Sequence, residues 1–237
     1  MINFLLKQNG YCHCCRSFVL FESHDTWLRD NFFCNKCRSI PRQRAIQYIL
    51  DNFFPHYVSS YIHESSPSNN FISQYCTNYS SSHFFEDIPL GEKNGIGIEC
   101  QNIEKLTFED NIFDIFITQE VMEHVFNPNL ASKEIMRVLK PGGVYIFTVG
   151  KWKKLSKSYP RARLKNGKID YLCEPEYHGN PIGDGRSLVT WYYGDDFEQL
   201  LSSWTSCVTT TYVTRDLSLG IDGEFLEVFV ITKSNNI

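Results

Sequence analysis

Residues 113–149 read FDIFITQEVMEHVFNPNLASKEIMRVLKPGGVYIFTV, and this stretch decides the fold class. Its two ends, FDIFIT (113–118) and VYIFTV (144–149), are apolar on both faces, which is typical of central strands in parallel sheets. The segment NPNLASKEIMRVL (127–139) between them repeats apolar residues at helical spacing. We expect the inward face of this helix to carry Leu130, Ile135, Met136, Val138 and Leu139. With LKPGG closing the helix in a turn, the order strand, helix, strand predicts a parallel unit of an α/β protein.

The same alternation extends in both directions along the chain. The pattern predicts strands at 57–62 and 96–100, a helix at 69–76, and a helix at 195–204 capped by Asp195. The last two β-rich runs, 208–214 and 224–233, are predicted to form an antiparallel hairpin at the end of the sheet. The predicted fold class is therefore α/β, with a mainly parallel sheet and helices on both of its faces.

Five of the nine cysteines lie within the first 37 residues, whereas the other four are scattered as expected for small buried residues. Two Cys-x-x-Cys pairs, Cys12 with Cys15 and Cys34 with Cys37, have the spacing of a four-cysteine zinc site. The alternatives are a disulfide pair and a free redox motif, and His13 and Cys14 offer competing ligands at the first pair. Four protein ligands would leave no open position, so the predicted zinc ion is structural.

This zinc-binding knuckle, assigned to residues 1–40, runs directly into a predicted helix at 41–53. The apolar face of that helix is predicted to comprise Ala45, Ile46, Ile49, Leu50 and Phe53. Three arginines, Arg38, Arg42 and Arg44, could contact RNA or a phosphate, but a solvated helix face is the preferred interpretation. Residues 41–237 are assigned to the α/β domain.

The overall charge gives no general attraction to nucleic acid or to an anionic membrane. The 237 residues have a formal net charge of −4, with an isoelectric point near 6.0. The first apolar run is too short for a signal peptide, and no later stretch approaches the length of a membrane span. We therefore expect a cytoplasmic protein with no membrane partner, for which nucleic acid is a disfavoured partner.

Two segments, LTFEDNIFDIFITQEVMEHV (106–125) and EIMRVLKPGGVYIFTV (134–149), resemble the central half of class I S-adenosylmethionine-dependent methyltransferases of the type 11 kind. The resemblance covers residues 57–235 in organisation, with sharp motifs between 101 and 149. It implies a Rossmann-like, seven-stranded sheet and S-adenosyl-L-methionine as the cofactor.

The cofactor loop that this resemblance implies departs from the usual family pattern. Members of the family usually place an acidic residue and spaced glycines after the first strand, so that the backbone can approach the methionine portion of the cofactor. Here the loop reads His63-Glu64-Ser65-Ser66-Pro67 and contains no glycine. Serine is small and can donate a hydrogen bond, and Glu64 could meet the ammonium group of the cofactor. The loop therefore resembles a variant that retains binding.

The remaining cofactor contacts follow from position in the family pattern. Ser81 and Ser82 stand where an acidic residue usually meets the ribose, Asn102 and Ile103 where adenine is bound, and Thr118, Gln119 and Glu120 near the sulfonium. No acid lies within residues 79–85, which puts ribose recognition in doubt. For each residue alone, a turn or surface role is the competing interpretation.

Methyl transfer to a hydroxyl or protonated amine requires alignment with the methyl group and removal of a proton. His124 in VMEHV is one candidate base, with packing or capping as its alternative role. The polar stretch 173–194 supplies His178, the preferred base, together with Tyr177, Glu176 and Asn180. We expect residues 150–194 to form the acceptor pocket, unless they are only a structural lid.

The eight basic residues between 151 and 168 form either a solvated loop or a surface that attracts a phosphorylated or nucleotide-linked acceptor. The leading hypothesis is a methyltransferase acting on a small polar acceptor, with O-methylation of a sugar or polysaccharide-pathway intermediate as its finer form. The alternatives are an RNA methyltransferase with a zinc knuckle and a non-catalytic binding protein that keeps the fold.

Overall fold

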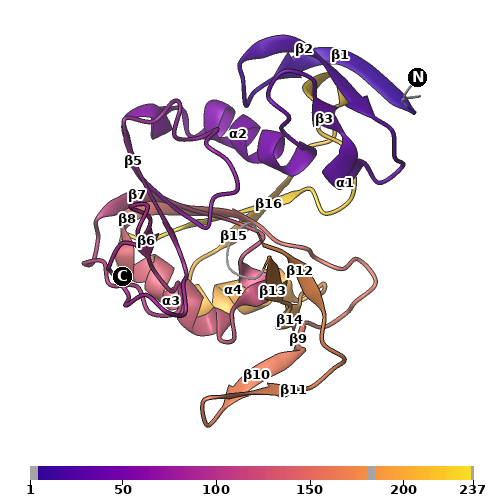
Figure 1. Ribbon diagram of the computed structural model, residues 1–237. Coiled ribbons are helices and arrows are strands. Elements are labelled where there is room, and N and C mark those ends of the chain that lie inside the picture. The colour runs from indigo at the N-terminus through magenta and orange to yellow at the C-terminus, as the bar shows by residue number, and fades with distance from the viewer. Residues whose placement is uncertain (1–4, 181–184, 236–237) are drawn as a thin grey trace.

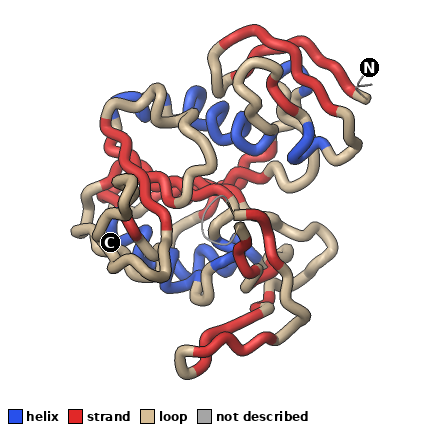
Figure 2. The backbone as a smooth tube through the Cα atoms, viewed as in Figure 1, coloured by secondary structure: helices blue, strands red, loops and turns tan. Residues whose placement is uncertain are grey.

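A seven-stranded, mainly parallel sheet forms the centre of the molecule (Figures 1 and 2). The computed structural model describes residues 5–180 and 185–235. The strand order is β15 (Thr209–Val213), β16 (Glu227–Thr232), β8 (Leu139–Thr148), β7 (Phe113–Gln119), β4 (Tyr61–Ser65), β5 (Asn78–His83) and β6 (Glu99–Cys100). Strands β4 to β8 pair in parallel, whereas β15 and β16 pair antiparallel to their neighbours. This confirms the predicted fold class, including the antiparallel C-terminal hairpin.

Two apolar clusters cover the two faces of the sheet. Successive residues of β7 point to opposite sides, so that Phe116 belongs to one cluster and Ile115 and Ile117 to the other. Helices α3 (Pro128–Val138) and α4 (Phe197–Thr205) contribute to the first cluster, and α2 (Pro41–Phe53) contributes to the second. The helices lie on both sides of the sheet, as Figure 2 shows.

The central unit folds as predicted, with two exceptions. Asn127 caps α3 by accepting a hydrogen bond from the Leu130 amide. Leu130 itself is 43% exposed, so its predicted inward position is wrong: it lies on the outer side of the first turn. The LKPGG segment does not form a separate turn but begins β8, and its Gly142 amide donates to the Lys233 carbonyl just after β16.

Two elements before β7 differ from the prediction. Residues 55–59 form the 3₁₀ helix η1 (Pro55–Ser59), which begins at a proline, so the first strand starts only at Tyr61. Residues 69–76 form turns rather than the predicted helix. The Asn69 side chain accepts a hydrogen bond from the Phe71 amide, an alternative to helical bonding that asparagine and serine favour. The predicted strand at 96–100 is reduced to two residues.

The N-terminal module is a small sheet of β1 (Leu6–Cys12), β2 (Ser17–Ser23) and β3 (Phe33–Cys34), with the short helix α1 (Leu28–Asn31). Its hairpin packs against η3 (Leu217–Leu219) of the larger domain (Figure 1). The predicted boundaries at 40 and 41 stay a prediction, because α2 contacts both parts.

Helix α2 has the predicted bounds but not the predicted faces. Phe53 is 50% exposed, because it lies in the last turn, beyond the core. Arg44, assigned to a solvated face, is fully buried. Its guanidinium donates to the carbonyl oxygens of Phe32 at 2.6 Å and Gly220 at 2.8 Å, and also to the Ser39 carbonyl. Arg44 therefore joins the N-terminal module to the loop that precedes β16.

The region between β8 and α4 is built from short strand pairs. They are β9 (Tyr159–Pro160) with β14 (Trp191–Tyr192), β10 (Ala162–Lys165) with β11 (Lys168–Tyr171), and β12 (Tyr177–Gly179) with β13 (Arg186–Leu188). The β10–β11 hairpin projects from the body of the molecule (Figure 1). Helix α4 follows with Asp196 rather than Asp195 at its N-cap; the Asp196 carboxylate accepts two bonds from Ser158. In the described ranges, no helix combines the length and the apolar composition that a bilayer crossing requires.

Candidate functional site

Most of the predicted cofactor residues lie at the carboxyl ends of the adjacent parallel strands β5, β4 and β7, and Asn102 and Ile103 follow β6. Ser65 at the end of β4 pairs with Ser82 of β5 on one side and with Thr118 of β7 on the other. The prediction that the loop begins at His63 is wrong, because His63, Glu64 and Ser65 pair on both sides as the end of β4. The loop proper begins at Ser66, between two other strand ends. In open α/β sheets, this is the edge at which ligands bind.

Glu64 is a buried carboxylate with two neutral hydrogen-bond donors. Tyr79 Oη donates to Glu64 Oε2 at 2.7 Å, and Gln119 Nε2 donates to Glu64 Oε1 at 2.8 Å. Burial raises the pKa of the Glu64 carboxyl to about 7, against the lowering effect of these two bonds. An ammonium group brought by a ligand would supply the cation that an ionised Glu64 needs.

His63 points to the opposite face of the sheet from Glu64, because successive side chains of a strand alternate. Its ring nitrogens lie 2.9 Å from the hydroxyls of Ser80 and Ser82, and its ring packs against Phe108 and Phe116. Burial lowers the pKa of His63 to about 3, so its ring is neutral at physiological pH. The Ser82 hydroxyl is thus engaged by His63, and contact of either residue with a cofactor stays a prediction.

Two residues at this edge take left-handed backbone conformations. Ser66 has a φ of 55° and donates its amide to the Ser82 carbonyl at 2.7 Å. Glu120, directly after β7, also has a φ of 55° and donates its amide to the Thr148 carbonyl at 3.0 Å. Such conformations cost free energy and tend to occur at functional sites. Ser66 adopts here the conformation for which glycine is the usual residue.

The residues predicted to contact adenine and ribose differ in their burial and in their hydrogen bonds. Asn102 Oδ1 accepts a hydrogen bond from the Glu104 amide at 2.8 Å, which forms a local turn after β6. Ile103 is buried in the apolar cluster that α3 covers. Ser81 is half-buried beside Glu64 in the β4–β5 register. Their contacts with a cofactor stay predictions.

The end of β7 holds buried oxygen atoms without a partner among the described residues. They are Gln119 Oε1 and Glu120 Oε1, whereas the Thr118 hydroxyl bonds to Tyr145 at 2.7 Å. Glu120 Oε2 accepts a hydrogen bond from the Arg29 guanidinium, which comes from α1 of the N-terminal module. Acceptors without donors fit a cofactor that carries an ammonium group and ribose hydroxyls. Sequence reasoning missed Arg29, since no local pattern connects it to β7.

The two candidate bases lie side by side. The ring centroids of His124 and His178 are 5.2 Å apart, at an interplanar angle of 89°. Burial lowers the pKa of His124 to about 4, so this imidazole is neutral at pH 7. Glu123 lies next to both, with its Oε1 atom 4.0 Å from His178 Nδ1. The structure thus brings together two residues that are 54 positions apart in the sequence, as the two residue numbers show.

Tyr177 and Asn180 lie on or next to strand β12, and each contacts strand β13. Tyr177 is exposed on β12, with the Arg186 guanidinium 5.1 Å from its ring. Asn180 Nδ2 donates to the Ser187 hydroxyl and supports the β12–β13 pair. Residues 181–184 of the predicted acceptor region lie outside the described residues.

A cavity of about 570 Å³ lies beside this site. Its lining includes four aromatic residues, Trp152, Tyr159, Tyr192 and Phe225, together with Lys153, Lys154, Leu155 and Glu224. The candidate bases do not line it, but one of its residues is connected to them: Tyr192 Oη donates to Glu176, whose Oε1 atom is 3.4 Å from His178 Nε2. The predicted acceptor region, together with Glu224 and Phe225, therefore lines an aromatic cavity that also contains two lysines.

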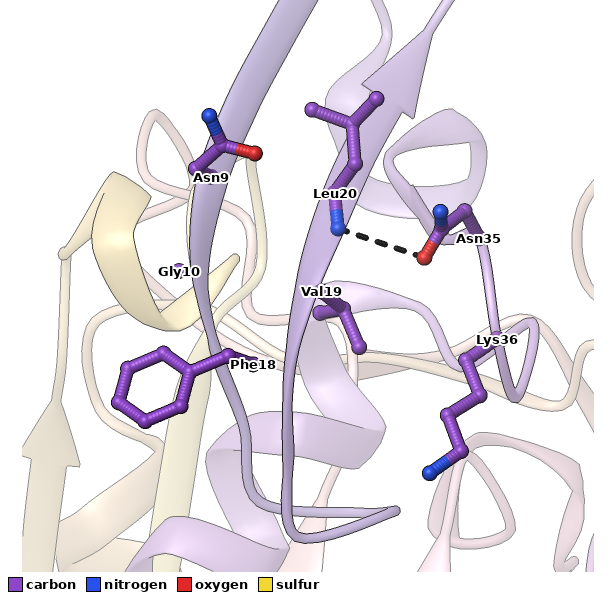
Figure 3. Close-up of a pocket in the computed structure, with 7 residues that line it drawn as sticks. All are labelled: Asn9, Gly10, Phe18, Val19, Leu20, Asn35 and Lys36. Carbon is purple, nitrogen blue, oxygen red and sulfur yellow. Dashed lines mark hydrogen bonds between the residues drawn. The ribbon is translucent and has the colours of Figure 1, made fainter.

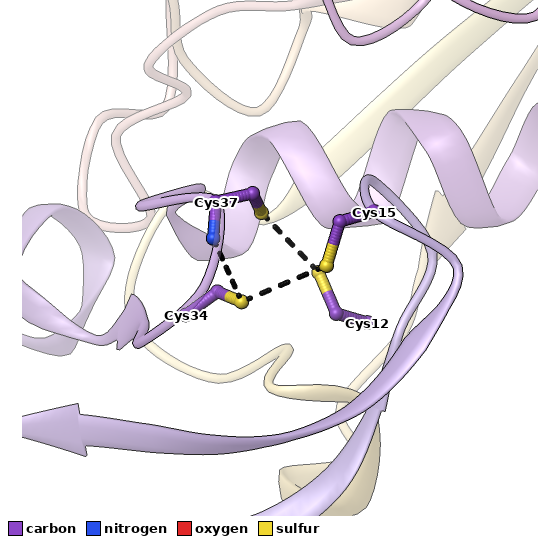
Figure 4. A group of neighbouring side chains, drawn as sticks. All are labelled: Cys12, Cys15, Cys34 and Cys37. Carbon is purple, nitrogen blue, oxygen red and sulfur yellow. Dashed lines mark hydrogen bonds between the residues drawn. The ribbon is translucent and has the colours of Figure 1, made fainter.

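The four cysteines of the N-terminal module converge on one point (Figure 4). The Sγ atoms of Cys12 and Cys37 are 3.7 Å apart, and those of Cys15 and Cys34 are 3.9 Å apart. Tetrahedral zinc with Zn–S bonds of about 2.3 Å requires sulfur atoms about 3.8 Å apart. The cluster therefore fits the predicted ion. The competing ligand His13 instead bonds to Asp51 at 2.7 Å through its Nδ1 atom.

A second pocket lies on the N-terminal module rather than at the strand ends (Figure 3). Asn9, Gly10, Phe18, Val19, Leu20, Asn35 and Lys36 line it. None of these is a candidate base or a buried carboxylate, so the pocket adds no chemistry to the site.

Residues 66–147 match the protein family described as "Methyltransferase domain". An uncharacterized methyltransferase of Schizosaccharomyces pombe is 30% identical over 116 residues, which are 47% of this chain and 41% of that protein. A ubiquinone biosynthesis O-methyltransferase of Coxiella burnetii is 40% identical over 53 residues, 22% of this chain and 23% of that protein. The matches thus span less than half of either relative.

The solved structure of an S-adenosylmethionine-dependent methyltransferase from Mesorhizobium loti superposes on this chain with a TM-score of 0.52. The sequence identity is 11%, and the match covers 80% of this chain and 98% of that one. This likeness shows the Rossmann-like α/β fold. The module that precedes the fold and the HESSP loop are features of this chain that none of these comparisons describes.

Proposed function

We propose that this chain is an S-adenosyl-L-methionine-dependent methyltransferase that acts on a small polar acceptor. The observation that carries the proposal is the environment of Glu64. A buried carboxylate that has no cationic partner among the described residues stands at the strand edge, just before the segment that matches the methyltransferase family. Its position suits the ammonium group of the cofactor's methionine portion.

The other cofactor contacts follow from the same edge of the sheet. Ser65 and Ser66 would let the loop backbone approach the methionine portion, while the unpartnered oxygens of Gln119 and Glu120 would accept hydrogen bonds beneath the sulfonium. Asn102 and Ile103 would face adenine, and Ser81 the ribose. His63 and Ser82 would support the loop from the opposite face of the sheet through their mutual hydrogen bond.

The acceptor would enter from the aromatic cavity toward the candidate bases. His178 is half-exposed and would take the proton of the acceptor, with His124 as the second candidate and Tyr177 at the rim. Aromatic rings can stack on the apolar faces of a sugar, and Lys153 and Lys154 would attract a phosphate or nucleotide group. The finer proposal is therefore O-methylation of a sugar or polysaccharide-pathway intermediate. The RNA alternative is weaker, since Arg44 is buried and Arg42 pairs with Asp30.

Calorimetric titration of the zinc-loaded protein with S-adenosylmethionine and S-adenosylhomocysteine tests the proposal. We expect binding that Glu64→Gln and Asn102→Ala weaken. Loss of a charge-assisted hydrogen bond costs about 1.5–3 kcal/mol, which corresponds to roughly a 10- to 100-fold loss of affinity for Glu64→Gln. Glu109→Gln, at an exposed position, is the matched control and should bind as the wild type does. Absence of binding to folded, zinc-loaded protein would reject the proposal and leave the non-catalytic binding protein.

A further inference from the structure

We propose that Glu123, His124 and His178 form a binding site for a divalent first-row transition-metal ion, separate from the four-cysteine cluster. One ligand atom from each of the three side chains lies within 4.8 Å of the others. Two imidazoles and one carboxylate are a common ligand set for such ions, and three ligands leave coordination positions open. Glu123 and His124 lie in the 3₁₀ helix η2 (Met122–His124), which follows β7, and His178 lies on β12.

His124 is oriented as a metal ligand. Its Nδ1 atom lies 2.9 Å from the Leu188 carbonyl oxygen, which can only accept, so Nδ1 carries the proton. The lone pair of the neutral ring is therefore on Nε2. A metal-binding histidine usually donates its other N–H to a backbone carbonyl or a carboxylate, because this fixes the tautomer and the ring orientation.

His178 is held by a similar outer contact. Its Nε2 atom lies 3.4 Å from Glu176 Oε1, while its Nδ1 atom faces Glu123 Oε1 at 4.0 Å. Glu176 is fixed in turn, because Tyr192 Oη donates to it and Arg161 lies 3.3 Å away. Each histidine thus has one nitrogen engaged outside the site and one nitrogen left for an ion.

One strand places both histidines. Strand β13 contains Leu188, which accepts the bond from His124, and it pairs with β12, where His178 stands opposite Ser187. The next residues continue the connection, since the Thr190 amide donates to the Glu123 carbonyl at 2.8 Å. The site is therefore assembled by the fold and does not depend on a chance contact between mobile side chains.

Glu123 supplies the charge that a cation would neutralise. The residue is 4% exposed, and its buried Oε2 atom has no hydrogen-bond partner among the described residues. The neighbouring Glu120 carboxylate is paired with Arg29, and among the described residues the one ion pair of Glu123 is with His178. A buried carboxylate oxygen of this kind is costly unless an ion or a proton satisfies it.

The spacing requires only a small closure. Metal–nitrogen and metal–oxygen bonds are about 2.0–2.2 Å, so two atoms that bind one ion lie roughly 3.0–3.5 Å apart. The 4.0 Å separation of Glu123 and His178 must therefore shrink by about 0.5–1 Å, and any of the three separations, all of which are within 4.8 Å, by at most about 1.8 Å. The His178 side chain is 45% exposed and can make this movement.

The role of the ion rests on the proposed function, whereas the site does not. An acceptor hydroxyl bound to the ion would have a lowered pKa and release its proton to solvent. Its oxygen would then attack the methyl carbon, and the new C–O bond would form as the C–S bond breaks and neutral S-adenosylhomocysteine leaves. With the ion bound, His124 and His178 would act as ligands, and the ion would replace His178 in the removal of the acceptor proton that is proposed above for the protein without the ion.

The test is a titration of zinc-loaded protein with Mn²⁺ in the absence of any cofactor, with free Mn²⁺ followed by electron paramagnetic resonance. Mn²⁺ has low affinity for thiolates and leaves the four-cysteine cluster intact, which a zinc assay before and after the titration verifies. We expect one Mn²⁺ per chain. His178→Ala and Glu123→Gln should abolish binding, and Glu176→Gln should weaken it about 10- to 100-fold as an outer contact. His56→Ala, at an exposed position elsewhere, is the control.

A parallel titration with Co²⁺ reports the ligands, because nitrogen and oxygen donors lack the intense charge-transfer bands of thiolates. Circular dichroism verifies that each variant is folded. Absence of both ions from the folded wild type, or binding unchanged by His178→Ala, overturns the inference. If the protein binds Mn²⁺ but not S-adenosylmethionine, the metal site is supported and the proposed function is rejected. If it binds S-adenosylmethionine but not Mn²⁺, the proposed function is supported and the metal site is rejected.

Discussion

Replacement of Glu64 by glutamine should make the protein more stable at pH 8 while it weakens cofactor binding. Burial raises the pKa of Glu64 from its usual 4.5 to about 7. Each pH unit between the two values corresponds to about 1.36 kcal/mol, so an ionised Glu64 reduces the free energy of unfolding by about 3 kcal/mol. Glutamine has no charge to bury and should recover most of this amount.

The sign follows from the protons bound in each state. Between pH 4.5 and pH 7 the folded protein keeps the Glu64 proton and the unfolded chain has released it, so stability falls as the pH rises through this window. The advantage of glutamine should therefore be largest above pH 7 and nearly absent at pH 4.5. The hydrogen bonds can be retained, because Gln119 Oε1 has no partner among the described residues and could accept from the new amide.

Urea unfolding of the wild type and Glu64→Gln at pH 4.5 and pH 8 measures the effect, with Glu109→Gln as the control for a surface carboxylate. Comparison with the variant removes the contributions of other titrating groups, notably His63 and His124, whose lowered pKa values make stability rise with pH. An identical pH dependence in the wild type and Glu64→Gln would show that Glu64 titrates normally, and the reasoning about its burial would be refuted.

Three further predictions concern the N-terminal module. Cys34→Ser, or removal of zinc by a chelator, should unfold the module. The melting temperature should fall, and metal analysis should show the loss of bound zinc. An unchanged melting temperature would exclude a structural ion. Arg44→Lys should lower the free energy of unfolding in urea by about 2–4 kcal/mol, because buried carbonyls lose their donors. The control Arg38→Lys, at an exposed position, should change it by no more than about 0.5 kcal/mol. Equal effects of the two substitutions would contradict the burial of Arg44. Gly10→Ala would place a Cβ atom 1.8 Å from the Ser218 carbonyl oxygen, so proteolysis should detect a detached module, and resistance equal to the wild type would argue against this packing.

The central unit could be predicted because its signals are local. FDIFIT and VYIFTV are contiguous apolar runs, and α3 has the periodicity of a packed helix, so each element is defined by its own residues. The four-cysteine site could be predicted for the same reason, since two Cys-x-x-Cys spacings place four thiols in two short segments. The predictions failed where a local pattern was weak. Residues 69–76 have helical spacing, but their polar side chains bond to the backbone in turns.

The sequence by itself determined the α/β class, the parallel order around β7, and the residue types available at the strand ends. Only the tertiary structure decided which of them meet. Glu64 is tied to β5 and β7, and Glu120 is paired with Arg29 of the N-terminal module. His124 bonds to Leu188 of β13, the strand that pairs with β12 and its His178. These contacts join segments tens of residues apart. Burial, which sets the pKa of Glu64 and hides Arg44, depends on all surrounding elements at once and leaves no periodic trace in the chain.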